Sequence, residues 1–235
     1  MKRIQHGIFL KKIDYSESSV IIHLFTLENG FQAFLFQGGK KKKANLLQPL
    51  SIVEITTYSR PDSDLGKISE VATDFVPQSI PFHPLKSGLA FFITEMLGQV
   101  LKSSDEDRKM YAFLKHEIQW IDASSELTNY PLFFLLKFAN QIGVGIHLAQ
   151  KEGRIFDLQE GEISNQTPTN HTYTNDEVVP ILSALLQSDR NEILAKKIHK
   201  THRRQIINHL MDYYTLHIDG FKVPKSLEVI QTIFD

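Results

Sequence analysis

Cysteine is absent from this chain of 235 residues. Without a thiol there is no disulfide scaffold, no zinc site or iron–sulfur cluster held by cysteine, and no cysteine nucleophile. No apolar run approaches the roughly 18 residues of a membrane helix, and charge precedes any apolar run at the N-terminus, so we expect a cytoplasmic protein without a membrane anchor. The motifs G-x-S-x-G, Walker A and G-x-G-x-x-G are also missing. We therefore expect a protein that is not an enzyme and needs no cofactor.

A net charge of one sign is lacking too, because 26 Lys plus Arg face 27 Asp plus Glu. Taken whole, this balance argues against a nucleic-acid-binding protein, which is usually basic. The charges are segregated, however: residues 1–60 carry nine basic and four acidic residues, residues 101–195 carry eight and fourteen, and residues 196–225 carry seven and two. The near-zero total is a cancellation between two basic segments and an acidic middle, and phosphate contacts depend on local Lys and Arg.

The first 76 residues hold β-branched and aromatic residues in short runs separated by turn residues. These runs predict strands over residues 4–13, 19–27, 31–37, 50–58 and 67–76. Asn29-Gly30 predicts a hairpin between the second and third strands through a type I′ turn, which needs positive φ at both positions. Five short strands without a helical period indicate a small closed barrel, and the OB fold is the natural candidate.

Beyond the strands, three prolines within residues 77–84 predict an extended linker, and the hydrophobic period then becomes helical. The pattern predicts helices over residues 85–100, 110–121, 131 to about 143, 178–187, 191–199 and 201–217, and a last helix capped by Ser226. Residues 148–175 lose the pattern and hold at most a short strand around residues 154–158.

The sequence therefore predicts an α+β protein. Its expected parts are a five-stranded OB-fold barrel in residues 1–78, a proline-rich linker in residues 79–84, an all-helical domain in residues 85–147 and 176–235, and an irregular insert in residues 148–175.

Four consecutive lysines, Lys40 to Lys43, follow two glycines between the third and fourth strands. Like charges at this density repel one another, so we expect a solvated loop that either solubilises the protein or attracts a polyanion. The basic surroundings on an oligonucleotide-binding type of barrel favour the second interpretation. The aromatic residues could stack on bases, at about 1 to 3 kcal/mol per base, but in strands they more often form the core. They are Phe9, Tyr15, Phe25, Phe31, Phe34, Phe36 and Tyr58.

Histidines and acidic residues raise two further hypotheses. His199 and His202 could present metal ligands together with His209 and His217, but a cap at Thr201 would break their register and no H-E-x-x-H motif is present. Residues 105–107 (Asp-Glu-Asp) could serve a two-metal nuclease, or could cap the helix that follows. We favour the structural interpretation of both and predict no metal site.

Four phrases within the first 58 residues follow one another in a family-specific order. They are Gly7 to Ser19 (GIFLKKIDYSESS), Leu24 to Gly30 (LFTLENG), Gly38 to Lys41 (GGKK) and Leu47 to Leu50 (LQPL). In order and spacing they resemble the N-terminal domain of the RecO family of bacterial DNA repair proteins. The helical part and residues 203–227 are compatible with the same family.

The resemblance implies a recombination mediator with an N-terminal OB fold and a helical domain. Such a protein binds single- and double-stranded DNA, anneals complementary strands and helps to load RecA onto DNA coated by the single-strand-binding protein SSB, in association with the nucleoid. Its implied partners are DNA, RecR and the acidic, hydrophobic C-terminal tail of SSB. Carried over by position, the residues that would hold DNA phosphates are Arg3, Lys11, Lys12, Lys40, Lys41, Lys42 and Lys43. Many members carry a four-cysteine zinc module, which the cysteine-free residues 148–175 replace here.

The SSB tail implies a site that combines basic side chains with an apolar pocket. Residues 196–214 offer this combination, with Lys200, Arg203 and Arg204 as the anchors, and a solvated helix face is the alternative. Two other functions stay open: a metal-dependent nuclease that uses residues 105–107, and a protein-only adaptor whose basic patches recognise acidic peptides.

Overall fold

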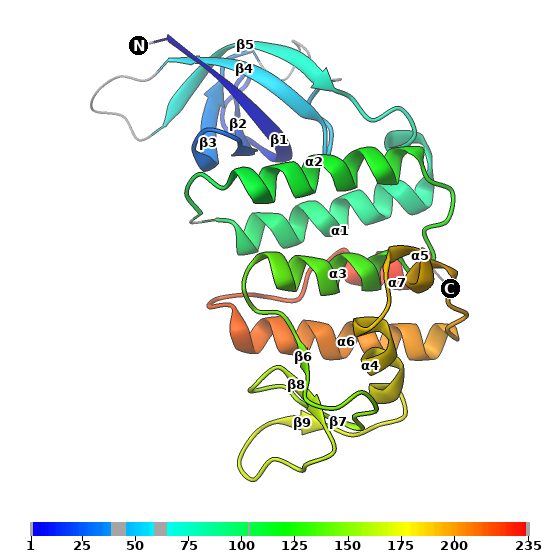
Figure 1. The fold of residues 1–235 in the computed structure, drawn as a ribbon. Coiled ribbons are helices and arrows are strands. Elements are labelled where there is room, and N and C mark those ends of the chain that lie inside the picture. The colour runs from blue at the N-terminus through cyan, green and yellow to red at the C-terminus, as the bar shows by residue number, and fades with distance from the viewer. Residues whose placement is uncertain (1, 39–45, 59–64, 103, 234–235) are drawn as a thin grey trace. The chain divides into compact units, whose positions relative to one another are not determined.

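The structure, a computed structural model, describes residues 2–38, 46–58, 65–102 and 104–233 (Figure 1). Its first strands are β1 (Lys2–Asp14), β2 (Val20–Thr26), β3 (Gly30–Phe36), β4 (Ile52–Tyr58) and β5 (Gly66–Phe75). A 3-10 helix, η2 (Ile80–Phe82), precedes α1 (Pro84–Val100), α2 (Arg108–Ala123), α3 (Tyr130–Gln141), α4 (Val179–Leu186), α5 (Arg190–Ala195), α6 (Lys200–His217) and α7 (Leu227–Ile233). The five strands and seven helices predicted from the sequence are confirmed, and so is the α+β class.

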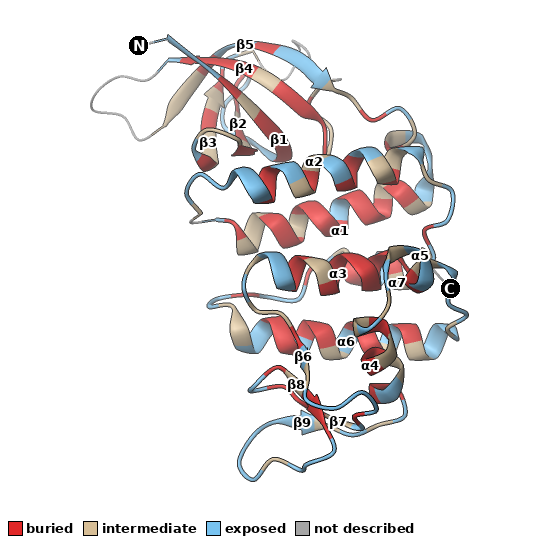
Figure 2. Ribbon diagram, viewed as in Figure 1, coloured by how far each residue is buried: buried red, intermediate tan, exposed pale blue. Residues whose placement is uncertain are grey.

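The five strands close into a barrel in the order β1-β2-β3-β5-β4. The long strand β1 makes closure possible because its first half pairs with β4 and its second half with β2. Neighbouring strands are antiparallel except β3 and β5, which run parallel. Alternate residues of β2 (Val20, Ile22 and Leu24) are buried in the barrel core, as the period of two requires. Figure 2 shows such buried positions along the barrel strands, so the core lies inside an OB-like five-stranded sheet.

The predicted hairpin joins β2 and β3, but its turn is not of type I′. Gly30 has a φ of 65° and pairs with Thr26, whereas Leu50 is the only described non-glycine residue with positive φ, so Asn29 has none. The Thr26 hydroxyl donates to the Gly30 carbonyl oxygen (2.9 Å) and accepts from the Asn29 N–H (3.1 Å). A three-residue loop (residues 27–29) followed by the left-handed Gly30 therefore closes the hairpin, and the type I′ prediction was wrong.

The proline-rich linker is fastened to α1 and α2. The Asp122 carboxylate of α2 accepts hydrogen bonds from the backbone N–H groups of Gln78 (2.9 Å), Ser79 (2.7 Å) and Ile80 (2.9 Å). Lys86 of α1 is buried, and its ammonium group donates to the Ser79 hydroxyl (2.8 Å) and the Asp122 carbonyl oxygen (2.7 Å). Burial lowers the pKa of Lys86, and the nearby Asp122 charge opposes that effect. Polar bonds to two helices thus fix the linker.

The chain forms two compact units. The first consists of residues 1–124 and 224–230, which are the barrel, α1, α2 and the start of α7. The second consists of residues 125–223 and 231–235. The compact units group α1 and α2 with the barrel, while the predicted domain limits at residues 78 and 85 stay a prediction.

The second unit is built around α3 and α6, which lie side by side (Figure 1). The Tyr214 hydroxyl of α6 donates to the Leu135 carbonyl oxygen of α3 (2.8 Å). Asn129, at the start of α3, is buried and its side chain makes no cap bond. Its amide donates to the carbonyl oxygen of Lys196 (2.7 Å) and so ties α3 to the chain after α5. None of the described helices combines the length and apolar character needed to cross a membrane.

The insert contains more regular structure than the sequence predicts. Four short strands, β6 (His147–Leu148), β7 (Ile155–Asp157), β8 (Glu162–Ser164) and β9 (Tyr173–Thr174), form a sheet in the order β6-β8-β7-β9. Only β7 was expected, because strands of two or three residues show too little of the period of two to be recognised. Phe156 of β7 is fully buried, with its ring centroid 5.6 Å from that of Tyr213 on α6. Backbone pairing and apolar packing therefore hold the described part of the insert together.

Candidate nucleic-acid interface

Strand β1 carries the predicted barrel cations at two separate ends. Arg3 lies on the half that pairs with β4, whereas Lys11 and Lys12 lie on the half that pairs with β2. All three residues are exposed. Eight residues of extended chain separate Arg3 from Lys11, about 26 Å at a rise of about 3.3 Å per residue. The three cations therefore form two separate groups on β1. We call the group at Arg3 the Arg3 end and the group at Lys11 and Lys12 the Lys11 end.

A β-bulge precedes the two lysines of the Lys11 end. The register with β2 shifts between Phe9 and Lys11, which leaves Leu10 as the extra residue. Bulges bend a strand and re-aim its side chains. Leu10 is buried, while Lys11 and Lys12 are both exposed and neither forms an ion pair with a described residue. Two adjacent ammonium groups are therefore free to meet an anion.

The pKa of His23 in β2 is affected by the positive charges at the Lys11 end. Burial lowers the pKa of His23, and the charges of Lys11 and Lys102 lower it further. The His23 ring packs edge-on against Phe31, with centroids 5.4 Å apart. Lys102 follows α1 in the chain, so folding adds to the Lys11 end a cation that the sequence analysis missed. No local pattern could have revealed it, because its neighbours are distant in sequence.

The Arg3 end has an aromatic ring between two lysines. Lys2 of β1 lies directly opposite Tyr58 of β4, and Tyr58 lies opposite Lys67 of β5. Residues directly opposite in a sheet project from the same face. Tyr58 is 42% exposed. This row places a surface that can stack on a base between two groups that can bind phosphates.

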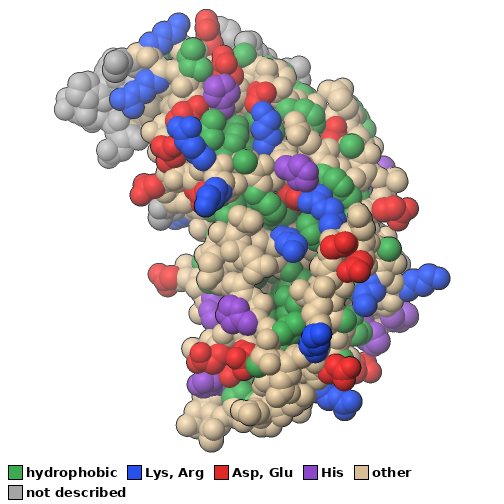
Figure 3. Space-filling model, viewed as in Figure 1, with side chains coloured by type: hydrophobic (Ala, Val, Ile, Leu, Met, Phe, Trp, Pro, Cys, Tyr) green, Lys and Arg blue, Asp and Glu red, His purple; other side chains and the backbone are tan. Residues whose placement is uncertain are grey.

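The tetralysine segment, Lys40 to Lys43, lies outside the described residues, so its role stays a sequence prediction. The described face of the barrel is not uniformly basic. Figure 3 shows Lys and Arg side chains interspersed with Asp, Glu and hydrophobic side chains there. Glu54 and Glu70 contribute acidic groups to β4 and β5.

Most barrel aromatics belong to the core, as the residue pattern favoured. Phe9, Phe25, Phe34 and Phe36 are buried, whereas Tyr15 and Tyr58 are exposed. Only the exposed rings are available to a ligand.

The three residues expected to hold the SSB tail differ in accessibility. Arg203 is buried, and its guanidinium donates to the Ile198 carbonyl oxygen (2.8 Å). Arg204 is exposed and donates to the Gln231 carbonyl oxygen (3.2 Å), and Lys200 is exposed at the start of α6. Burial argues against Arg203 as a surface anchor and leaves Lys200 and Arg204 as the accessible pair.

The histidines of the second unit bind carboxylates and carbonyl groups. His209 contacts Asp176 (2.6 Å) and His202 contacts Glu177 (3.2 Å). The cap expected at Thr201 was wrong, because α6 begins at Lys200 with His199 as its N-cap. Burial raises the pKa of Asp176, but the hydrogen bond and charge of His209 and the hydrogen bonds from Gln205 and Val178 together lower it more. Among the described residues, no group of three or more His, Asp or Glu side chains is placed to hold a metal ion.

The acidic segment 105–107 has a capping role. The Asp107 carboxylate accepts a hydrogen bond from the Met110 N–H (2.9 Å) and caps α2, and Glu106 pairs with Arg108 (2.6 Å). The helix-cap interpretation is confirmed.

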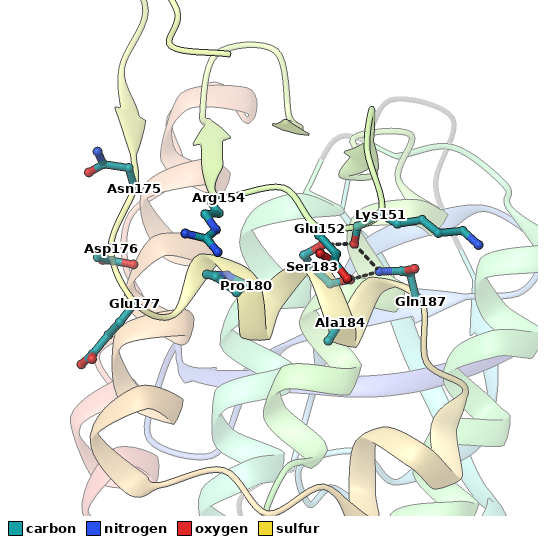
Figure 4. A pocket seen from close by; sticks show the side chains of 10 residues that line it. All are labelled: Lys151, Glu152, Arg154, Asn175, Asp176, Glu177, Pro180, Ser183, Ala184 and Gln187. Carbon is teal, nitrogen blue, oxygen red and sulfur yellow. Dashed lines mark hydrogen bonds between the residues drawn. The ribbon is translucent and has the colours of Figure 1, made fainter. Parts of the chain in front are cut away.

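A pocket of about 580 Å³ lies in the second unit between the β6–β7 turn, the segment before α4, and α4 itself (Figure 4). The carbonyl oxygen of Lys151 accepts hydrogen bonds from the Ser183 hydroxyl (3.1 Å) and the Gln187 amide (2.9 Å). Arg154 and Asp176 bring opposite charges to its lining. Such a mixed surface carries charges of both signs and does not favour an anion.

Comparisons with known proteins cover both parts of the chain. Residues 1–74 match the family model "Recombination protein O N terminal", and residues 82–227 match "Recombination protein O C terminal". The chain is 29% identical over 234 residues to the DNA repair protein RecO of Phocaeicola vulgatus, with 97% of both chains covered. It is 30% identical over 237 residues to that of Bacteroides fragilis (97% of this chain, 98% of the relative) and 27% identical over 233 residues to that of Christiangramia forsetii (97% of both).

Proposed function

The chain belongs to the recombination protein O family, a family of DNA repair recombination mediators, and we propose that it works by binding DNA through its barrel. The observation that carries this proposal is the exposed pair Lys11 and Lys12, which lies behind a bulge on the long strand of an OB-type barrel. Lys102 adds charge to the same end. Exposed ammonium groups without protein partners bind DNA phosphates and release counterions.

We further propose that the protein anneals complementary single strands and helps to load RecA onto DNA coated by SSB. Annealing requires a protein that binds both single- and double-stranded DNA without catalysing a reaction. The proposed partners are RecR and the acidic tail of SSB, and Lys200 and Arg204 are the exposed candidates for contact with that tail. The proposal includes no metal and no cofactor.

The salt dependence of DNA binding tests the proposal. The double variant Lys11→Ala with Lys12→Ala and the quadruple alanine variant of Lys40 to Lys43 are compared with the unaltered chain at several salt concentrations. The slope of log K against log salt should become shallower by about 0.7 per lost phosphate contact on single-stranded DNA and about 0.9 on duplex. Lys151→Ala, an exposed lysine of the second unit, is the matched control and should leave the slope unchanged.

An unchanged slope in the Lys11 and Lys12 variant removes the assignment of DNA binding to that end. Undetectable DNA binding by the unaltered chain, with binding of an acidic peptide retained, would favour a protein-only adaptor. Cleavage of labelled DNA after incubation with magnesium or manganese would favour a nuclease.

A further inference from the structure

A groove of about 700 Å³ lies within the first compact unit. Its walls are the end of β1, residues 47–49, the outer face of α1 and the start of α7. A smaller pocket of about 310 Å³ continues it and shares Gln48, Pro49 and Phe91 with it. The volume falls in the range of about 300 to 1,000 Å³ that is typical of ligand sites.

The groove exposes apolar surface that folding has not covered. Phe91 is 57% exposed although its neighbour in α1, Phe92, is fully buried, and Val229 of α7 is 50% exposed. An aromatic ring left open in a groove has a free face on which a flat, apolar partner can stack.

The charge at the groove is positive on the β1 side. Lys11 and Lys12 both line it. The carboxylate of Glu95 also lines the groove but accepts hydrogen bonds from the backbone N–H of Ser226 (3.0 Å) and its hydroxyl (2.7 Å). The negative charge is therefore already bonded to protein donors, while the ammonium groups are open to an anion.

The wall formed by residues 47–49 adjoins β1 and is followed by a strained backbone position. Leu50, fully buried, has a φ of 66°, and its N–H donates to the Phe9 carbonyl oxygen (3.0 Å). A left-handed leucine is uncommon, and such strain is concentrated at binding sites. Leu50 ends a turn that contains Gln48. The side-chain oxygen of Gln48 is buried and accepts no hydrogen bond from the described residues.

We propose that this groove binds unstacked bases of single-stranded nucleic acid. A base stacks on Phe91, and the flanking phosphates lie at Lys11 and Lys12. The inference rests on the proposed function, since the same lysines hold DNA there. It adds that the site distinguishes strands: bases in a duplex are stacked on each other and do not reach the ring, so the groove selects single strands.

Fluorescence anisotropy with a labelled thymidine oligonucleotide and a duplex of equal length tests the proposal on the full chain. Phe91→Ala should weaken single-strand binding about 5- to 150-fold, leave duplex binding unchanged and leave the salt slope unchanged, because stacking releases no counterions. Phe91→Tyr, which keeps the ring, should restore binding. Tyr173→Ala, an exposed aromatic of the second unit, should change neither affinity.

The outcomes separate this inference from the proposed function. If Phe91→Ala binds single strands normally while the Lys11 and Lys12 variant has a shallower salt slope, the groove proposal is overturned and the proposed function stands. Equal weakening of single-strand and duplex binding by Phe91→Ala also overturns it. So does normal DNA binding by Phe91→Ala with loss of a protein ligand, since the groove would then be a protein docking site. If the lysine variant leaves DNA binding unchanged, the proposed assignment fails on its own.

Discussion

Gly30 offers a sharp test of how the first unit is packed. Its φ is 65°, and a Cβ at this position would overlap the backbone carbonyl oxygens of Ser104 and Asp105. The next residue, Phe31, donates its N–H to the Ser104 carbonyl oxygen (3.1 Å), so the α1–α2 connection packs directly on the hairpin. We predict that Gly30→Ala destabilises this unit by displacing the connection.

The expected magnitude has two parts. A left-handed backbone costs alanine about 1 to 2 kcal/mol of the free energy of unfolding. Displacing the connection removes about one hydrogen bond, about 0.5 to 1.5 kcal/mol. Gly30→Ala should thus cost about 1.5 to 3.5 kcal/mol. Gly220 has a φ of 67° but no atom within 4 Å of a Cβ, so Gly220→Ala should cost only the first part. Gly98 lies inside α1 with open space around it, and Gly98→Ala should stabilise by about 0.5 to 1 kcal/mol.

Hydrogen exchange of the full chain is the suitable assay because it reports the opening free energy of each compact unit from that unit's own buried amides. The amides of the barrel strands report Gly30→Ala and Gly98→Ala, and those of α6 report Gly220→Ala. The reasoning is refuted if Gly30→Ala costs no more than Gly220→Ala, because the close approach to the α1–α2 connection would then carry no penalty.

Three further predictions concern polar groups. Burial raises the pKa of Glu95, but hydrogen bonds from Ser226 and its neighbour lower it more. These bonds should therefore stabilise α7 at a pH above the ordinary carboxyl pKa of 4.5, and the stabilisation should be lost as the pH falls through the lowered pKa of Glu95. Glu95→Gln should speed amide exchange at Ser226 at neutral pH. Burial raises the pKa of Asp157, but the hydrogen bond from His171, the backbone hydrogen bonds from Glu160 and Gln159 and the charge of His171 together lower it more. The hydrogen bond with Asp157 raises the pKa of His171. The amides of the insert should therefore be most protected from exchange at a pH between the pKa of Asp157 and that of His171. Protection should be lost as the pH falls through the pKa of Asp157 or rises through the pKa of His171. In a pH series of amide exchange, His171→Gln should remove the loss of protection at high pH. Asp107→Ala should cost about 1 kcal/mol in urea unfolding, and Asp107→Ser should recover most of it.

The sequence predicted regular elements wherever a period could repeat. The strands of the barrel and the seven helices show several repeats of their periods, whereas β6, β8 and β9 have two or three residues each. The type I′ prediction failed for a different reason: Asn29-Gly30 specifies a turn, but the Thr26 side chain decides its geometry through two hydrogen bonds.

The site was only partly predictable. Lys11 and Lys12 were found from their motif, but Lys102 and the groove at Phe91 depend on packing between segments far apart in sequence. The burial of Arg203 could have been predicted, since it lies three residues before Ile206 and four before Ile207, both of which the helical pattern places inward. The sequence analysis chose Arg203 for its positive charge and did not consider that its position on the helix places it inward.

The return of residues 224–230 to the first unit bears on how the protein is synthesised. Glu95 and Ser226 bond to each other across 131 residues of chain. At about 5 to 20 residues per second, a ribosome needs about 7 to 26 s between them. Throughout that interval the nascent chain holds a barrel and α1 without the segment that completes their groove, so Phe91 and its apolar surroundings face chaperones and neighbouring nascent chains. The unit that is translated first is therefore among the last to be finished.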